Sequence, residues 1–178
     1  MDAAAHYRQL IKLGRDEFLA AAAPAALVRF RSEGTSEPSG RGRTLTLDDE
    51  ASGDGHASID ETLPLGSFSV TDIDMAVHPL LKKPNAPFPD RITIGRTSNN
   101  DVAIPDHSIS RLHAYLKLQG TTWVVADAGS KNGSWLRGEA LDARKEKAIT
   151  SREVLRLGDV DLTFYLAADL FQVLGGQP

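Results

Sequence analysis

The chain has 178 residues, with 24 acidic side chains, 20 basic side chains and a formal net charge of −4 at pH 7. A chain with this charge balance lacks the positive field that attracts nucleic acids and anionic membranes, so we expect neither as a partner. The chain contains no cysteine, which excludes disulfides, thiolate catalysis and cysteine-ligated zinc. The length suits one domain with an extension or two small domains, and the composition suits a cytoplasmic protein.

Residues 1–31 carry an amphipathic helical pattern. Apolar side chains recur at helical spacing over His6–Ala23, and Pro24 disfavours a further helical turn. A single amphipathic helix cannot bury its own apolar face, so this one must dock on another domain, self-associate or bind a partner. Its apolar end is too short to span a membrane, and Asp16 and Glu17 argue against a secretory signal.

Residues 32–66 predict a flexible, disordered acidic linker. They are rich in Gly, Ser, Thr, Pro and acidic residues and contain no Lys or Arg after Arg43. Thr44, Thr46 and Thr62 lie in this segment, where a kinase could reach them. They are either plain solvated linker residues or phosphorylation sites.

Residues 67–166 carry a β pattern. Short apolar and β-branched runs alternate with Gly, Asn, Asp and Pro turn signals, which is typical of an antiparallel sandwich. Residues 167–178 are expected to form a short C-terminal helix or tail. The expected strands are Ile73–Val77, Arg91–Ile94, Ala114–Leu118, Thr122–Ala126, Ser134–Leu136, Val154–Leu157 and Val160–Leu166.

Three polar motifs fall on turns between these strands: Gly95-Arg96, Ser110-Arg111-Leu112-His113 and Asp127–Gly133. Guanidinium groups offer a planar fork of donors to phosphate oxygens, and hydroxyl and amide groups add directed hydrogen bonds. None of the motifs pairs a nucleophile with a base or supplies a set of metal ligands. We therefore expect recognition rather than catalysis, with no cofactor and no metal.

The order and spacing of the three motifs resemble those of the forkhead-associated (FHA) family of phosphothreonine-binding domains. The resemblance covers about residues 73–166. It implies a mainly β fold, a two-sheet antiparallel β-sandwich whose peptide site lies in the loops at one end. It also implies an adaptor in Ser/Thr kinase signalling that binds phosphothreonine-containing proteins.

The resemblance assigns roles within the motifs. Arg96 is expected to clamp the phosphate, Ser110 to contact it, and Arg111 to contact phosphate or peptide backbone. Asn132 is expected to hydrogen-bond the peptide main chain, and Lys131 to add charge near the phosphate. The residues expected to support these loops are Gly95, His113 and Gly133.

Other interpretations remain open. Asn132-Gly133 can also serve as a plain hairpin turn, because both residues tolerate positive φ. The chain could be a phosphate-independent scaffold that acts through its N-terminal helix. If a linker threonine is phosphorylated, it could dock into the Arg96 site of the same chain or of a second copy. An enzyme is not expected, because the phosphate-cradling Gly-x-x-x-x-Gly-Lys loop is absent.

Overall fold

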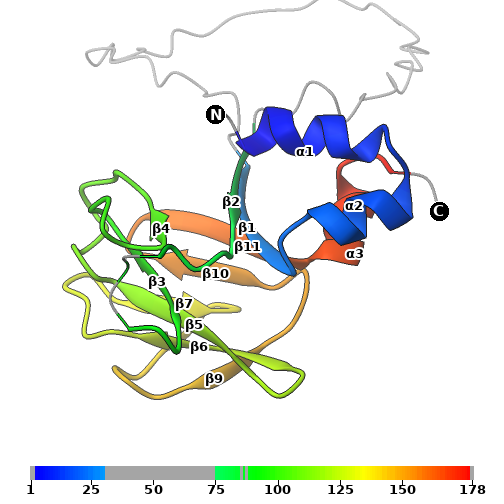
Figure 1. The fold of residues 1–178 in the computed structure, drawn as a ribbon. Coiled ribbons are helices and arrows are strands. Elements are labelled where there is room, and N and C mark those ends of the chain that lie inside the picture. The colour runs from blue at the N-terminus through cyan, green and yellow to red at the C-terminus, as the bar shows by residue number, and fades with distance from the viewer. Residues whose placement is uncertain (1–2, 31–74, 85, 87, 177–178) are drawn as a thin grey trace, which may run out of the picture.

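The computed structural model describes residues 3–30, 75–84, 86 and 88–176. Two β-sheets pack face to face, and three short helices gather beside one of them (Figure 1). This arrangement confirms the expected two-sheet sandwich, preceded by a helical segment. The acidic linker expected at 32–66, with Thr44, Thr46 and Thr62, lies outside the described residues.

One sheet has six strands in the order β2-β1-β11-β10-β7-β8, and all of its neighbours are antiparallel. Its strands are β1 (Ala25–Phe30), β2 (Met75–Pro79), β7 (Ser134–Leu136), β8 (Glu139–Ala140), β10 (Val154–Leu157) and β11 (Val160–Leu166).

The other sheet has five strands in the order β4-β3-β5-β6-β9. It is antiparallel except for the pair of β3 and β4, which is parallel, so the sheet is mixed. The exception is confined to a strand of two residues. The strands are β3 (Ile92–Gly95), β4 (Val102–Ala103), β5 (Ala114–Gln119), β6 (Thr122–Asp127) and β9 (Lys147–Ile149).

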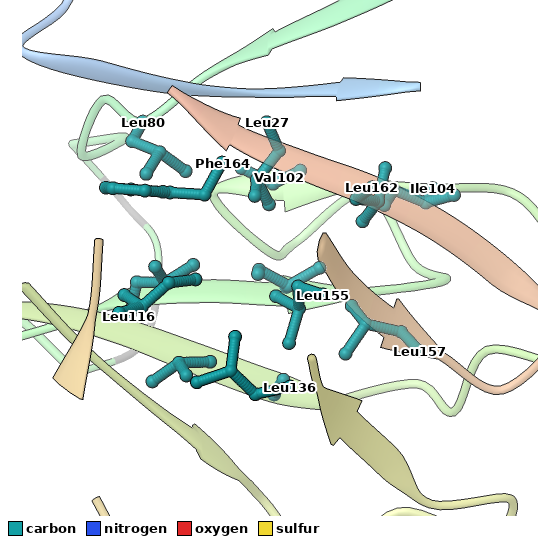
Figure 2. Packing of buried hydrophobic residues seen from close by; sticks show 14 of the residues in the cluster. Leu27, Leu80, Val102, Ile104, Leu116, Leu136, Leu155, Leu157, Leu162 and Phe164 are labelled. Atoms are coloured by element: carbon teal, nitrogen blue, oxygen red, sulfur yellow. The ribbon is translucent and has the colours of Figure 1, made fainter. Parts of the chain in front are cut away.

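The main core lies between the sheets, where Figure 2 shows side chains from both sheets meeting. Strand β10 illustrates why the sequence forms this layer: Leu155 and Leu157 are fully buried, while Val154 and Arg156 between them are exposed. Successive side chains of a strand point to opposite faces, so this alternation presents one apolar face to the other sheet.

The helices are α1 (Ala3–Ile11), α2 (Arg15–Ala21) and α3 (Ala167–Val173). The single helix expected over residues 6–23 is divided in two, because Gly14 adopts φ 104° between α1 and α2. A second apolar cluster joins the helices to the outer face of the six-stranded sheet. Its helical members include Tyr7, Phe18 and Phe171. The N-terminal helices therefore dock on their own β domain.

Strand β1 was not expected from the sequence. It lies between β2 and β11, so residues before the linker form part of the sandwich. Leu27 faces the main core and Val28 faces the helical cluster, and both are fully buried. A strand buried on both faces is apolar throughout rather than alternating, which is why Ala25–Val28 looks like the end of an apolar helix.

Candidate functional site

The turn after β3 brings two loops into close contact. A Cβ added at Gly95 would lie 2.1 Å from the carbonyl oxygen of Arg111, so a larger residue would push the loops apart. The Arg96 backbone N–H donates to the Ser110 carbonyl at 2.9 Å. Arg96 is thus held by its backbone, while its side chain is exposed and forms no ion pair with any described residue.

His113 ties the next two loops together from inside the protein. It is fully buried, and its Nδ1 accepts a hydrogen bond from the Ser110 backbone N–H at 3.0 Å. Its Nε2 therefore carries the proton and donates to the Gly133 carbonyl at 2.9 Å. Burial lowers the pKa of His113 below its ordinary value, although the Gly133 carbonyl and the Asp127 charge oppose this. The neutral ring serves as a brace between the loops.

Asp127 builds the loop between β6 and β7. Its buried carboxylate accepts hydrogen bonds from the backbone N–H groups of Gly129 and Ser130 at 2.7 and 2.8 Å. It also accepts from the hydroxyls of Ser130 and Ser134, each at 2.6 Å. Burial acts to raise the pKa of Asp127, but these hydrogen bonds outweigh it and hold the pKa below its usual value. The Asp127 carboxylate therefore holds the shape of its own loop through these hydrogen bonds.

The three loops surround one open cleft of about 940 Å³, which we call the loop cleft. All five residues expected to contact a phosphopeptide line it, and none of the described residues that line it is Asp or Glu. Arg111 and Lys131, like Arg96, are exposed and make no ion pair with a described residue. The lining residues are Arg96, Thr97, Asn99, His107, Ser108, Ile109, Ser110, Arg111, Leu112, Gly129, Lys131 and Asn132.

Two polar side chains of the cleft are held by hydrogen bonds and still have hydrogen atoms that can be donated to a ligand. The Ser110 hydroxyl oxygen accepts from the Lys131 backbone N–H at 3.0 Å, which leaves its own hydrogen able to donate to an anion. Asn132 Nδ2 donates one hydrogen bond to the Ser108 carbonyl at 2.8 Å, so its second hydrogen remains to serve a ligand. The cleft therefore combines three cations with directed donors.

Two residues that shape the cleft were not expected from the sequence. Asn100 is almost fully buried, and its Nδ2 donates to the carbonyls of Thr97 and Arg111 at 2.9 and 2.7 Å. Ser108 donates its hydroxyl to Asp106 Oδ1 at 2.8 Å and accepts from the Asp159 backbone N–H at 3.1 Å. In the sequence Asn100 is one of the Asn and Asp residues typical of turns, and no local pattern marks Ser108.

One segment of the chain matches a known family. Residues 92–158, which include all three loops, match the family model of the FHA domain. Residues 92–158 form an FHA domain. The FHA domain thus contains the whole loop cleft.

Two relatives each match less than half of this chain. An FHA domain-containing protein of Arabidopsis thaliana is 35% identical over 69 residues, which are 38% of this chain and 18% of that protein. The glycogen accumulation regulator GarA of Mycolicibacterium smegmatis is 30% identical over 70 residues, 39% of this chain and 42% of GarA. The chain therefore spans less than half the length of these two relatives.

A solved structure of EmbR from Mycobacterium tuberculosis in complex with a low-affinity phosphopeptide superposes with a TM-score of 0.44 and 26% identity. The match covers 52% of this chain and 22% of the EmbR chain.

Within the described part of our chain, no helix is long and apolar enough to cross a lipid bilayer.

Proposed function

We propose that this protein binds phosphothreonine-containing proteins through the loop cleft and acts as an adaptor in Ser/Thr kinase signalling. The observation that supports this most directly is the convergence of Arg96, Arg111 and Lys131 on one cleft whose described lining residues include no Asp or Glu. A phosphothreonine carries nearly two negative charges and three strong acceptor oxygens, which match these cations and the Ser110 hydroxyl.

Each expected contact has a proposed role. Arg96 and Arg111 bind phosphate oxygens through their guanidinium forks, and Ser110 donates its hydroxyl. Asn132 donates to a carbonyl of the peptide main chain, and Lys131 adds a long-range attraction. Gly95, His113 and Gly133 keep the loops at this spacing. Partner selection then depends on phosphorylation by a Ser/Thr kinase, and no bond is made or broken in the partner.

The alternative, a phosphate-independent scaffold that acts through the N-terminal helix, has less support. The apolar faces of α1 and α2 are already covered, because Tyr7, Leu10 and Phe18 are buried against the chain's own sheet and α3. A partner that bound this face would first have to displace these contacts.

The test is a calorimetric titration with one peptide in three forms: phosphothreonine, phosphoserine and unmodified threonine. The peptide is first selected from a phosphothreonine library with degenerate flanking positions. We expect binding to the phosphothreonine form and at least tenfold weaker binding to unmodified threonine, because a charged hydrogen bond is worth roughly 1.5–3 kcal/mol. Equal affinity for these two forms would contradict the proposal.

A further inference from the structure

Two neighbouring lysines that lie outside the matched family segment hold one of the loops of the cleft. Lys82 and Lys83 belong to residues 80–84, which follow β2 and which we call the lysine strap. The strap is hydrogen-bonded to residues 96–101, the turn between β3 and β4, and part of this turn lines the loop cleft. The family match begins at residue 92, so it does not include the strap.

Asp101 anchors the backbone of the strap. Its side chain is fully buried, and its Oδ1 accepts a hydrogen bond from the Lys83 backbone N–H at 2.7 Å. Its Oδ2 lies 2.8 Å from Lys82 Nζ and also accepts from the Thr93 backbone N–H and hydroxyl, at 2.8 and 2.9 Å. Burial acts to raise the pKa of Asp101, but these hydrogen bonds outweigh it and hold the pKa below its usual value. The strap is therefore fixed to the turn without any help from the Lys83 side chain.

The Lys83 side chain makes a second, separate attachment to the same turn. Its Nζ donates to the Asn100 carbonyl at 2.6 Å and to the Ser98 carbonyl at 3.3 Å. An ammonium group has three donors and no acceptor, so two carbonyl oxygens of one turn are suitable partners for it. The residue itself is exposed, and the attachment is therefore made at the surface of the protein.

Asn100 connects this attachment to the cleft. Its carbonyl binds Lys83, while its Nδ2 donates to the Arg111 carbonyl at 2.7 Å. The amide has little room to move, because a Cβ added at Gly95 would come within 2.6 Å of Asn100 Nδ2. A chain of hydrogen bonds thus runs from the Lys83 ammonium through Asn100 to the main chain of Arg111, which lines the cleft.

We propose that Lys83 is a positioning residue for phosphopeptide binding, which acts through Asn100 on the main chain of Arg111. This inference rests on the proposed function, in which Arg111 binds the phosphate. A guanidinium fork binds phosphate oxygens in a defined geometry, so a loosened turn weakens this contact although the arginine is still present. Lys83 is not one of the described residues that line the cleft, so its effect is indirect.

The experiment titrates the full chain with the selected phosphothreonine peptide and with its unmodified threonine form. The variant Lys83→Met removes the ammonium, whereas the Lys83 backbone contact to Asp101 remains. The matched control is Lys145→Met, because Lys145 is another exposed lysine, bonded to Asp142 and outside the cleft. Chemical denaturation measures the free energy of unfolding of both variants.

We expect Lys83→Met to bind the phosphopeptide about fivefold more weakly at a nearly unchanged free energy of unfolding, and Lys145→Met to bind normally. The loss should persist in high salt. Raising the salt from about 0.1 M to about 1 M shortens the Debye length from about 10 Å to about 3 Å, which removes a through-space attraction but leaves the positioning of the turn in place.

A double-mutant cycle tests the route through Arg111. In the Arg111→Ala background, Lys83→Met should cost less than about twofold in affinity, because the side chain that it positions is already absent. In the Asn132→Ala background the loss of about fivefold should remain, since Asn132 belongs to a different loop and is held by the Ser108 carbonyl.

Unchanged affinity in Lys83→Met, an equal loss in Lys145→Met, a loss that disappears in high salt, or equal losses in the two backgrounds would overturn the positioning role and leave the proposed function standing. Equal affinity of the natural protein for the phosphorylated and unmodified peptides would overturn both.

Discussion

At the residue scale, the site separates side chains that shape the loops from side chains that remain available to a ligand. His113 and Asp127 are buried and saturated with hydrogen bonds inside the protein. Arg96, Arg111 and Lys131 are exposed and make no ion pair with described residues. Substitutions in the first group should act on stability, and substitutions in the second group on binding.

Arg96→Ala should weaken phosphopeptide binding at least tenfold without unfolding the protein. The substitution removes a charge-assisted fork worth roughly 1.5–3 kcal/mol, whereas the Arg96 backbone contact to Ser110 remains. Calorimetry with the selected phosphopeptide measures the loss. Lys145→Ala removes an exposed cation outside the cleft and should leave affinity unchanged, and an unchanged affinity in Arg96→Ala would remove this arginine from the site.

His113→Ala should lower the free energy of unfolding by roughly 2–4 kcal/mol, because it leaves a cavity and removes the hydrogen-bond partner of the half-buried Ser110 N–H and Gly133 C=O. Chemical denaturation measures this loss. His107→Ala is the control, since the His107 side chain is 93% exposed and should have almost no effect. If His113→Ala abolished binding in a protein of unchanged stability, the bracing role would be wrong.

Stability should fall as the pH is lowered below about 6.5, the ordinary pKa of histidine. Burial lowers the pKa of both His113 and His78 in the folded protein, and Arg29 lowers that of His78 further. In the window below 6.5 the unfolded chain therefore binds more protons than the folded one, so acid favours unfolding. The carboxyls of Asp101 and Asp127 have lowered pKa values, so their contributions are lost only in stronger acid.

The measurement for this prediction is denaturation at pH 7.5, 6.5 and 5.5. The free energy of unfolding should decrease in that order, and more weakly in His113→Ala. A protein that is more stable at pH 5.5 than at pH 7.5 would contradict the assignment of lowered pKa values to His113 and His78.

At the scale of elements, a helical layer that the FHA match does not include packs on the six-stranded sheet. The family match begins at residue 92, whereas α1, α2 and β1 lie before it. The Phe18 ring lies 5.8 Å from the Tyr7 ring and 5.2 Å from the Phe171 ring, centroid to centroid, so it joins α1, α2 and α3. The helices lie away from the loops that form the cleft (Figure 1).

Phe18→Ala should reduce the free energy of unfolding by roughly 3–5 kcal/mol, since it empties a fully buried aromatic position. Urea denaturation provides the measurement. Leu19→Ala truncates the exposed neighbour and should cost far less. Where Phe18→Ala is still folded, it should bind the selected phosphopeptide normally, and a selective loss of binding would show that the helical layer acts on the cleft.

At the scale of the whole molecule, the described residues that flank segment 31–74 lie near the loop cleft. Phe30 at the end of β1 pairs with Met75 at the start of β2. The adjacent Arg29 lies 3.7 Å from Asp106, which precedes the cleft residues His107 and Ser108. A phosphorylated residue in this segment would therefore be tethered close to the Arg96 site.

We predict that phosphorylation of Thr44 or Thr46 makes the segment compete with outside phosphopeptides, because a short tether gives an effective concentration near millimolar. The full chain is phosphorylated in vitro, its sites are mapped, and the titration is repeated. Affinity for the outside peptide should fall, or dimers should form, and the Thr44→Ala/Thr46→Ala double variant should show neither change. Thr62 is mutated separately, because it is closer to β2 in the sequence.

If the phosphorylated protein bound the outside peptide as tightly as the unmodified protein and stayed monomeric, the self-docking prediction would be wrong.

The sequence by itself determined the features that depend on local patterns. The alternation in Val154–Leu157 predicts a strand with one buried face, and the three polar turns predict the loops that form the cleft. The strand and the turns can both be predicted from the sequence, because side-chain period and turn chemistry depend on neighbouring residues. All five expected contact residues line the same cleft, and their binding roles remain predictions.

Only the tertiary structure decided which apolar segments are buried, and against what. Ala25–Val28 is a central strand because both of its faces are covered, and nothing within the segment reveals the partners on either side. The role of Ser108 and the contact between Lys83 and Asn100 likewise arise between distant segments. Local patterns determine the period of a segment, but the packing of the whole chain determines its partners.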